Sequence, residues 1–202
     1  REDGRVSTPA IEIGASTNRY KHIGICNIAR ATSLYGEKMR AMFGCGEGGY
    51  QLGFDFASLE NVIQGHHILP YDGDELAKQL VAEKPNDLHS ANAKKIGISR
   101  GDAKSITYAL LYGAAASKLK KMLGITDAQA KLLYEQIWDA VLPLKLLKER
   151  LTASWQANGK KFILAIDGRK LFVRSQHSIL NMLFQGNGVL CAKWVTVLMF
   201  RN

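Results

Sequence analysis

The sequence predicts an α+β protein, in which a strand precedes a series of helices and a short hairpin precedes a last helix. Three observations support this class. The segment 50–56 alternates apolar and small residues, as a strand would. Amphipathic segments with helix-start and helix-stop residues then fill the middle of the chain. Finally, Asp167-Gly168 lies between two short alternating segments and is a strong signal for a two-residue hairpin turn.

The first third of the chain has little regular pattern. Residues 1–50 are rich in Gly, Ser, Thr and Asn, and predict loops and short elements with one short helix over 35–43. The strand over 50–56 follows. Helical character then runs from Ser58 to about His67 and ends near Pro70.

The next two segments predict helices bounded by start and stop residues. The first spans 75–84 and stops at Pro85. The second spans 87–96, with Asn86 as its N-cap and Gly97 just past its end.

Two further helices each start at capping-box spacing. Ser99 and Asp102 open a helix that runs to residue 112, before a glycine. Thr126 and Gln129 open another, which Pro143 ends, and one more helix runs to about residue 157. After the hairpin strands over 161–166 and 169–174, a last helix begins at Ser178. Its side chains expected to face a core are Ile179, Leu183, Leu190 and Trp194.

Composition indicates a polyanionic partner. The 202 residues include 27 Lys and Arg against 18 Asp and Glu, a formal charge of +9, and nucleic acid is the usual partner of such a chain. The three cysteines are an odd number without a CxxC pair, which argues against a disulfide framework or a structural zinc site and fits a reducing cytosol.

No membrane segment is expected. The longest apolar stretch, 189–200, is interrupted by Lys193 and is too short to span a bilayer, and no signal peptide is visible. The chain begins with Arg1 and ends inside an apolar helical pattern, so we expect it to be a piece of a longer protein.

Asp55 is the first candidate for chemistry. It ends an apolar strand beside Phe54 and Phe56. A carboxylate there needs a cation or hydrogen-bond donors, and Mg²⁺ binds one or two carboxylates together with waters and substrate phosphate. The alternative is that Asp55 caps the helix starting near Ser58.

A stripe on one helix is the second candidate. Spacing by four places Arg100, Lys104, Tyr108 and Tyr112 within about 120° of the helix circumference. Cations near a helix N-terminus are unfavourable for the helix itself, whereas together they suit a triphosphate, and the rings could stack on a base or sugar. The alternative is a solvated basic turn followed by core tyrosines.

Asn181 and Gln185, four apart on the last helix beside two glycines, are the third candidate. Such amides suit contact with nucleic acid, and the alternative is that both face solvent. The adjacent His66 and His67 point about 100° apart and are interpreted as structural. His89 has no local signal for a function.

Taken in order, these residues resemble family A DNA polymerases, the group of bacterial DNA polymerase I, and most closely the replicative polymerases of short-tailed phages. The family's motif A is matched at Asp55 and Glu60. Its motif B, RxxxKxxxYxxxYG in the phage form, is matched over 100–113. The segments 19–27, 35–44 and 167–185 also follow the family pattern in order.

The resemblance implies part of a right-hand polymerase. Residues 1–70 would be a palm segment with motif A, 71–160 helical fingers with motif B, and 161–202 a hairpin and a helix returning to the palm. The activity implied is template-directed addition of deoxynucleotides to a primer 3′-OH by two-metal phosphoryl transfer, with two Mg²⁺ ions in the complete enzyme. The partners implied are primer–template DNA and deoxynucleoside triphosphates, and the cytoplasm of a bacterial host is the expected location. A processivity factor is a candidate partner of the parent protein.

The resemblance also implies a role for each site residue. Asp55 and the main-chain carbonyl of Phe56 would hold the metal. Glu60 would crowd the 2′ position of the sugar. The groups implied to contact the triphosphate are His89, Arg100 and Lys104, with Lys104 also acting in catalysis. The nucleotide sugar would face Tyr108, and Tyr112 would close over the templating base pair. The residues implied to touch DNA are Arg19, Asn181 and Gln185.

Two departures from the family pattern leave other functions open. Val62 stands where motif A usually has arginine, and the family's motif C, a His-Asp-Glu, is not found in the chain. A His-Asp-Glu after Asn202 in the parent gene would settle whether the parent is an enzyme, and this piece alone is expected to be inactive. The alternatives are a non-catalytic DNA-binding remnant and an RNA-directed or RNA-synthesising relative. The role implied for Glu60 argues against ribonucleotide use.

Overall fold

The computed structural model describes residues 4–25, 27–84 and 86–201, and the chain divides into two compact units, Arg1–Ala57 and Ser58–Asn202. The first unit contains a two-residue antiparallel pair, β1 (Ala10–Ile11) with β2 (Lys21–His22), and one short helix, α1 (Gly36–Ala41). The helix expected over 35–43 is therefore confirmed, one or two residues shorter at each end.

The strand expected over 50–56 is wrong. These residues lie outside any strand, and the apolar side chains of Tyr50, Leu52 and Phe54 are exposed. Alternation alone does not hold a strand, because its backbone groups need a neighbouring strand to pair with. Among the described residues, no strand pairs with this segment.

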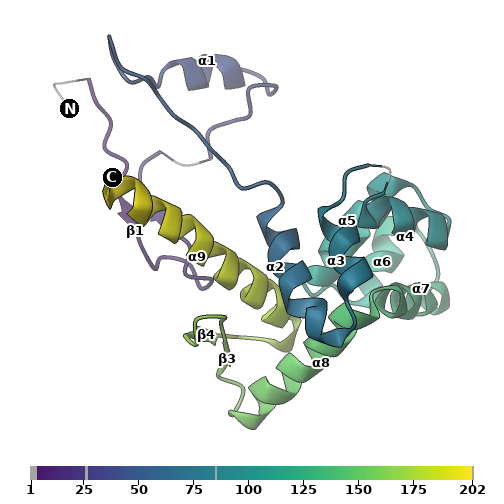
Figure 1. Ribbon diagram of the computed structural model, residues 1–202. Coiled ribbons are helices and arrows are strands. Elements are labelled where there is room, and N and C mark those ends of the chain that lie inside the picture. The colour runs from purple at the N-terminus through teal and green to yellow at the C-terminus, as the bar shows by residue number, and fades with distance from the viewer. Residues whose placement is uncertain (1–3, 26, 85, 202) are drawn as a thin grey trace. The chain divides into compact units, whose positions relative to one another are not determined.

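The second unit is a helical assembly with one hairpin (Figure 1). Its elements in chain order are α2 (Leu59–Ile68), η1 (Leu69–Tyr71), α3 (Asp74–Val81), α4 (Leu88–Ile96), α5 (Arg100–Leu111), α6 (Ala116–Leu123), α7 (Asp127–Ala140), α8 (Leu142–Ala157), β3 (Phe162–Leu164), β4 (Lys170–Phe172), η2 (Gln176–Ser178) and α9 (Ile179–Arg201). With its helices and small antiparallel sheets, the chain has the α+β class that the sequence predicts.

Local sequence signals explain most helix ends. At α7, the Thr126 side chain accepts from the Gln129 N–H while the Gln129 side chain accepts from the Thr126 N–H, a complete capping box. Ser99 caps α5 by accepting from the Asp102 N–H at 3.0 Å. Pro143 ends the α7 pattern by standing in the first turn of α8, where a missing N–H costs nothing.

Several boundaries differ from expectation. The hairpin strands β3 and β4 have three residues each, shorter than the expected 161–166 and 169–174. Helix α3 ends at Val81, three residues earlier than the sequence predicts, because Ala82 is extended; Pro85 itself lies outside the described residues. Helix α4 is capped by Asp87, not Asn86, because the Asp87 side chain immediately precedes the first helical residue and accepts from the Ser90 N–H at 2.9 Å.

The core lies between the helices of the second unit and one face of the hairpin. Its most deeply buried large apolar side chains are Ile68, Ile106, Leu119, Ile163, Leu171, Ile179 and Leu183. The hairpin alternates around Leu171, which is 1% exposed between exposed Lys170 and Phe172. Leu190 is only half-buried, and the expectation that Trp194 faces the core is wrong, because it lies on the second half of α9, where it is 61% exposed.

Helix α9 with the preceding turn, Gln176–Arg201, is long and apolar enough to cross a membrane by length and composition, which corrects the expectation drawn from its shorter apolar stretch. The core helix of a soluble protein meets the same criterion, and a third of the apolar window is buried against the rest of the chain. This feature is therefore weak support for a membrane span.

The end of α5 is fixed by a glycine. Gly113 has φ +84°, and a Cβ there would come within 2.3 Å of the His177 carbonyl oxygen. We expect Gly113→Ala to lower the free energy of unfolding by about 3 kcal/mol or more, since backbone strain and overpacking add. Gly124→Ala is the matched control: φ is +66° but nothing lies within 4 Å of the Cβ position, so only the strain of about 1–2 kcal/mol is expected. Urea denaturation measures both, and equal losses would contradict the close approach at Gly113.

A buried amide connects α2, α9 and the hairpin. Asn187 is 1% exposed, and its Oδ1 accepts from the Ile166 N–H at 3.1 Å. That contact fixes the orientation of the Asn187 amide. The Asn187 Nδ2 therefore donates to His67 Nε2 at 2.7 Å. His67 can accept only while Nε2 carries no proton. Burial lowers the pKa of His67, and the neighbouring His66 lowers it further.

This contact predicts a pH-dependent stability. Because the pKa of His67 is lower in the folded chain than in the unfolded chain, the unfolded state binds more protons as pH falls through the ordinary histidine range. We expect the free energy of unfolding to fall between about pH 7 and about pH 5. His67→Gln keeps an acceptor for Asn187 without a titrating group and is expected to reduce that fall. An unchanged pH slope in urea titrations would contradict this role.

Candidate functional site

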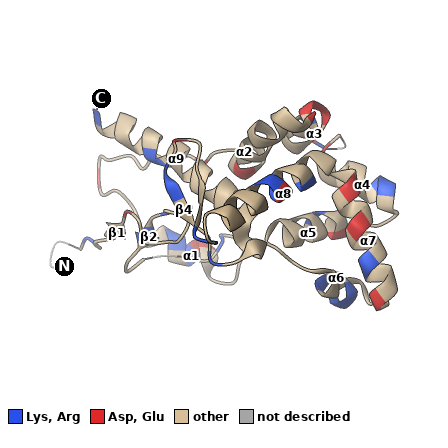
Figure 2. Cartoon of the chain, turned by 90° about the horizontal axis from the view of Figure 1, so that it is seen from below, with Lys and Arg blue, Asp and Glu red and all other residues tan. Residues whose placement is uncertain are grey.

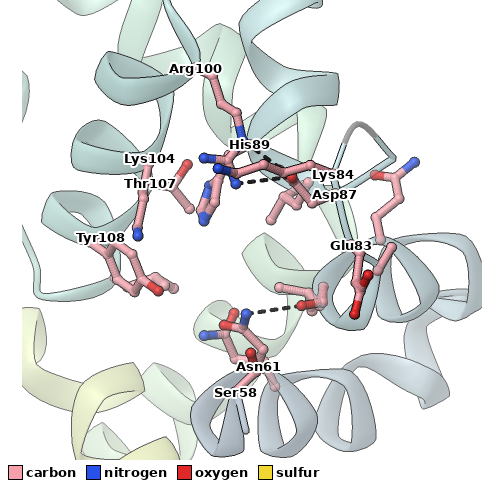
Figure 3. A pocket seen from close by; sticks show the side chains of 16 residues that line it. Ser58, Asn61, Glu83, Lys84, Asp87, His89, Arg100, Lys104, Thr107 and Tyr108 are labelled. Atoms are coloured by element: carbon pink, nitrogen blue, oxygen red, sulfur yellow. Dashed lines mark hydrogen bonds and ion pairs between the residues drawn. The ribbon is translucent and has the colours of Figure 1, made fainter.

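A cavity of about 450 Å³ opens between α2 and α3 on one side and α4 and α5 on the other (Figure 3). One wall is α2 with α3 and the residues next to them: Ser58, Asn61, Gln64, Gln79, Leu80, Ala82, Glu83 and Lys84. The other wall is α4 and α5: Asp87, Leu88, His89, Arg100, Lys104, Thr107, Tyr108 and Leu111. Asn61 closes the first wall by donating to the Leu80 carbonyl oxygen at 2.9 Å.

The spacing by four on α5 places three of the four stripe residues on one cavity wall. Arg100, Lys104 and Tyr108 all line the cavity, on successive turns of the helix. The Lys104 Nζ lies 5.9 Å from the centre of the Tyr108 ring. Tyr108 is half-buried and packs against the hydrophobic core, whereas Tyr112 is 51% exposed, so the alternative of core tyrosines holds in part for Tyr108 and is wrong for Tyr112.

His89 faces the same cavity from α4. Its ring centre lies 5.7 Å from that of Tyr108. Burial lowers its pKa, and the nearby Arg100 and Lys104 lower it further against the opposing effect of Asp87. The ring is therefore neutral at pH 7. Its Nδ1 is buried with no hydrogen-bond partner in the structure, which leaves one polar atom available for a ligand.

Asp87 is the residue of this wall that the sequence reasoning missed. Its Oδ2 accepts from Arg100 Nη2 at 2.9 Å and from Arg100 Nε at 3.2 Å. Although burial raises the pKa of this carboxyl, the Ser90 N–H and Arg100 lower it more, so Asp87 is ionised. The sequence signal that could have found it is an aspartate directly before an amphipathic helix.

The cavity suits an anion. It has three cationic side chains, Lys84, Arg100 and Lys104, against the carboxylates of Glu83 and Asp87. Two of these cations lie on the first turns of α5, so the helix does not gain stability from them. A phosphate-bearing ligand would use both the guanidinium and the ammonium group.

Glu60, Tyr112 and Gln185 meet at the end of α5. The Tyr112 hydroxyl has both Glu60 of α2 and Gln185 of α9 as hydrogen-bonding partners. Burial raises the pKa of Tyr112, and the Glu60 carboxylate raises it further. The Tyr108 and Tyr112 rings are stacked with centres 6.4 Å apart, which links this group to the cavity wall. Gln185 and Asn181 are half-buried, so neither is a freely solvated amide.

Asp55, Phe56 and Arg19 belong to the first unit. Asp55 and Arg19 are exposed. The alternative that Asp55 caps the next helix is wrong, because Ser58 occupies the N-cap position of α2. Within residues 4–25, 27–84 and 86–201, no group of three or more His, Cys, Asp or Glu side chains could hold a metal ion. The donors available for Mg²⁺ are the open Asp55 carboxylate and the Phe56 carbonyl, both hard oxygen ligands of the kind that Mg²⁺ prefers.

Basic side chains also gather away from the cavity. Figure 2 shows Lys and Arg on α6, where the residues are Lys118, Lys120 and Lys121. One of them is paired, since Lys120 lies 2.8 Å from Asp127. Helix α6 itself was not predicted from the sequence, although Leu119, Met122 and Leu123 have the i, i+3, i+4 spacing of an amphipathic helix.

Comparison with known proteins gives one consistent family. The family model of DNA polymerase family A matches residues 1–189. The proteins named DNA-directed DNA polymerase in Enterobacteria phage T3 and Escherichia phage T7 are each 29% identical to this chain over 218 residues. Each of these alignments covers 96% of this chain and 30% of the relative, so the chain spans under a third of their length.

Bacterial enzymes match more distantly. The thermostable DNA polymerase I of Thermus filiformis is 25% identical over 181 residues, which cover 84% of this chain and 21% of that protein. Among solved structures, the POL domain of Pol1 from M. smegmatis, in complex with DNA primer-template and dNTP, matches with a TM-score of 0.73 at 21% identity. That match covers 93% of this chain and 36% of the solved chain, and at this identity it supports the fold.

Proposed function

Because this chain belongs to DNA polymerase family A, we propose that it forms palm and fingers parts of an enzyme that extends a DNA primer on a template. The palm comprises residues 1–70, the helical fingers 71–160, and residues 161–202 the hairpin and the helix that returns to the palm. The observation that carries the proposal is the cavity wall on which His89, Arg100, Lys104 and Tyr108 come together.

The triphosphate of a deoxynucleotide binds along α5. Arg100 and Lys104 contact its phosphate oxygens, and their charges offset the charge that develops on the leaving pyrophosphate. His89 is neutral and donates a hydrogen bond to a phosphate oxygen from one ring nitrogen. Lys104, one helical turn after Arg100 on the same wall, also acts in catalysis through its ammonium group.

The sugar and base lie toward the end of α5. The Tyr108 ring faces the sugar, and Glu60 crowds the 2′ position so that deoxyribose is preferred over ribose. Tyr112, held by Glu60 and Gln185, closes over the templating base pair. Base-pair shape then governs incorporation as the fingers close.

Mg²⁺ is the implied metal. Asp55 and the main-chain carbonyl of Phe56 would hold one ion, and the complete enzyme would use two. When bound, the metal supplies electrostatic stabilisation of the attacking and leaving oxygens. What the chain's own residues contribute is a negatively charged, solvent-open carboxylate that attracts the cation.

Primer–template DNA is the macromolecular partner. Arg19, Asn181 and Gln185 contact it, and the formal charge of +9 favours a polyanion in general. A processivity factor is a further candidate partner of the parent protein. The proposed location is the cytoplasm of a bacterial host.

The test is primer extension by a polymerase that contains this segment. We expect deoxynucleotides to be added in the order that the template dictates. Binding of primed DNA without extension, in a protein that also has a second metal-binding carboxylate, would favour a non-catalytic DNA-binding protein. Preferential use of ribonucleotides would favour an RNA-synthesising enzyme.

A further inference from the structure

One carboxylate makes contact with both helices of the cationic wall. Asp87 Oδ1 accepts from the Ser90 N–H at 2.9 Å and so caps α4. Its Oδ2 accepts from Nη2 and Nε of Arg100, the first residue of α5 (Figure 3). Asp87 is 7% exposed, whereas the Arg100 side chain keeps 34% of its surface open.

The charge of Asp87 does not explain why a carboxylate lines a cavity that suits an anion. A buried carboxylate that lines an anion-binding cavity repels the anion, so it lowers the electrostatic attraction of the site. An unpaired arginine has many rotamers, and holding one of them costs conformational entropy when a ligand binds. Two hydrogen bonds to one oxygen fix the guanidinium before the ligand arrives, and Nη1 remains directed away from this contact.

We propose that Asp87 is a positioning residue for the nucleotide triphosphate. It fixes Arg100, and by capping α4 it also fixes the first turn that carries His89. The carboxylate itself does not touch the nucleotide. This inference rests on the proposed function of the cavity, and it goes beyond it by assigning the preorganisation of the phosphate contacts to one side chain.

Asp87→Asn separates the two effects of this residue. Asparagine caps a helix as well as aspartate does, so α4 and the fold are retained. The substitution removes one negative charge from an anion site, which by electrostatics alone tightens triphosphate binding. Loss of the contact that positions Arg100 would instead weaken triphosphate binding. Electrostatics alone and positioning therefore predict opposite changes in affinity.

Asp102→Asn is the matched control. Asp102 is an acidic residue in the first turn of α5, exposed and outside the cavity, and it accepts from the Ser99 hydroxyl at 2.7 Å. Asp102→Asn removes the same charge, and it does so on α5, the helix that carries Arg100. The described hydrogen bonds of Arg100 go to Asp87 and not to Asp102.

Calorimetric titration of dATP with Mg²⁺ into the 202-residue chain measures the effect. We expect Asp87→Asn to weaken binding roughly tenfold, as for the loss of a charge-assisted hydrogen bond, and Asp102→Asn to leave it unchanged or slightly tighter. In an Arg100→Ala background, Asp87→Asn is expected not to weaken binding, because the weakening acts through Arg100. Equal or tighter binding by Asp87→Asn, or the same weakening without Arg100, would overturn the inference.

A second measurement does not depend on nucleotide binding. If the wild-type chain binds no dATP, the proposed function of the cavity fails, and the NMR signal of the Arg100 Nε–H group still tests the positioning. We expect that signal to be resolved from those of free arginines in the wild type and in Asp102→Asn, and to move to the free position in Asp87→Asn. The same signal position in wild type and Asp87→Asn would overturn the inference.

Discussion

Asp55→Asn is expected to abolish primer extension, with a loss of at least about 10³-fold, in a polymerase that carries this segment together with its second metal-binding carboxylate. The substitution removes a negatively charged oxygen ligand for Mg²⁺ and changes little in volume. Affinity for primed DNA should be largely preserved, because Asp55 is exposed and is not proposed to contact a phosphate.

Glu47→Gln is a suitable control for Asp55, since Glu47 is an exposed carboxylate of the same unit. Extension rates from single-turnover kinetics and DNA affinities from fluorescence anisotropy are the two readouts. If Asp55→Asn lowered DNA affinity as much as it lowered the rate, Asp55 would have a structural role and the metal assignment would be wrong.

Lys104→Ala is expected to cost on the order of 10²–10³ in the rate of incorporation, the usual effect of removing one electrostatic stabiliser from a preorganised site. The cavity places its ammonium group on the same wall as Arg100 and His89. Lys118→Ala is the control, because Lys118 is exposed on α6 and lies outside the cavity. A loss below about tenfold for Lys104→Ala would favour a solvated side chain without a catalytic role.

The sequence predicted the elements whose signals are local. The capping box of Thr126 and Gln129 involves residues three apart and appears as expected. A hairpin is also present at Asp167-Gly168, but the expected two-residue turn is wrong: with Leu164 opposite Lys170 and the Ala165 N–H donating to the Arg169 carbonyl oxygen, the loop has three residues, 166–168. Elements that depend on distant partners were predicted poorly. The alternation over 50–56 has no pairing strand among the described residues, and Trp194 continues an apolar helical pattern beyond the part of α9 that packs on the core.

In the candidate site, too, the sequence predicted what depends on local spacing and missed what depends on packing between helices. The period of α5 was sufficient to place Arg100, Lys104 and Tyr108 on one face, because spacing by four is a property of the helix itself. No local pattern indicated that His89 of α4 lies 5.7 Å from Tyr108, or that Asp87 pairs with Arg100, since those contacts arise from the packing of α4 on α5. Only the resemblance to the polymerase family drew attention to His89.

The most direct test of the account is whether the cationic wall of α4 and α5 recognises a triphosphate. The measurement is a comparison of dATP with deoxyadenosine, each titrated in the presence of Mg²⁺ into the wild-type chain and into a variant with Arg100→Ala and Lys104→Ala. We expect dATP to bind the wild type, deoxyadenosine to bind far more weakly, and the double variant to lose the difference between them. Equal affinity for the two ligands in the wild type, or the same preference for dATP in the double variant, would contradict the account.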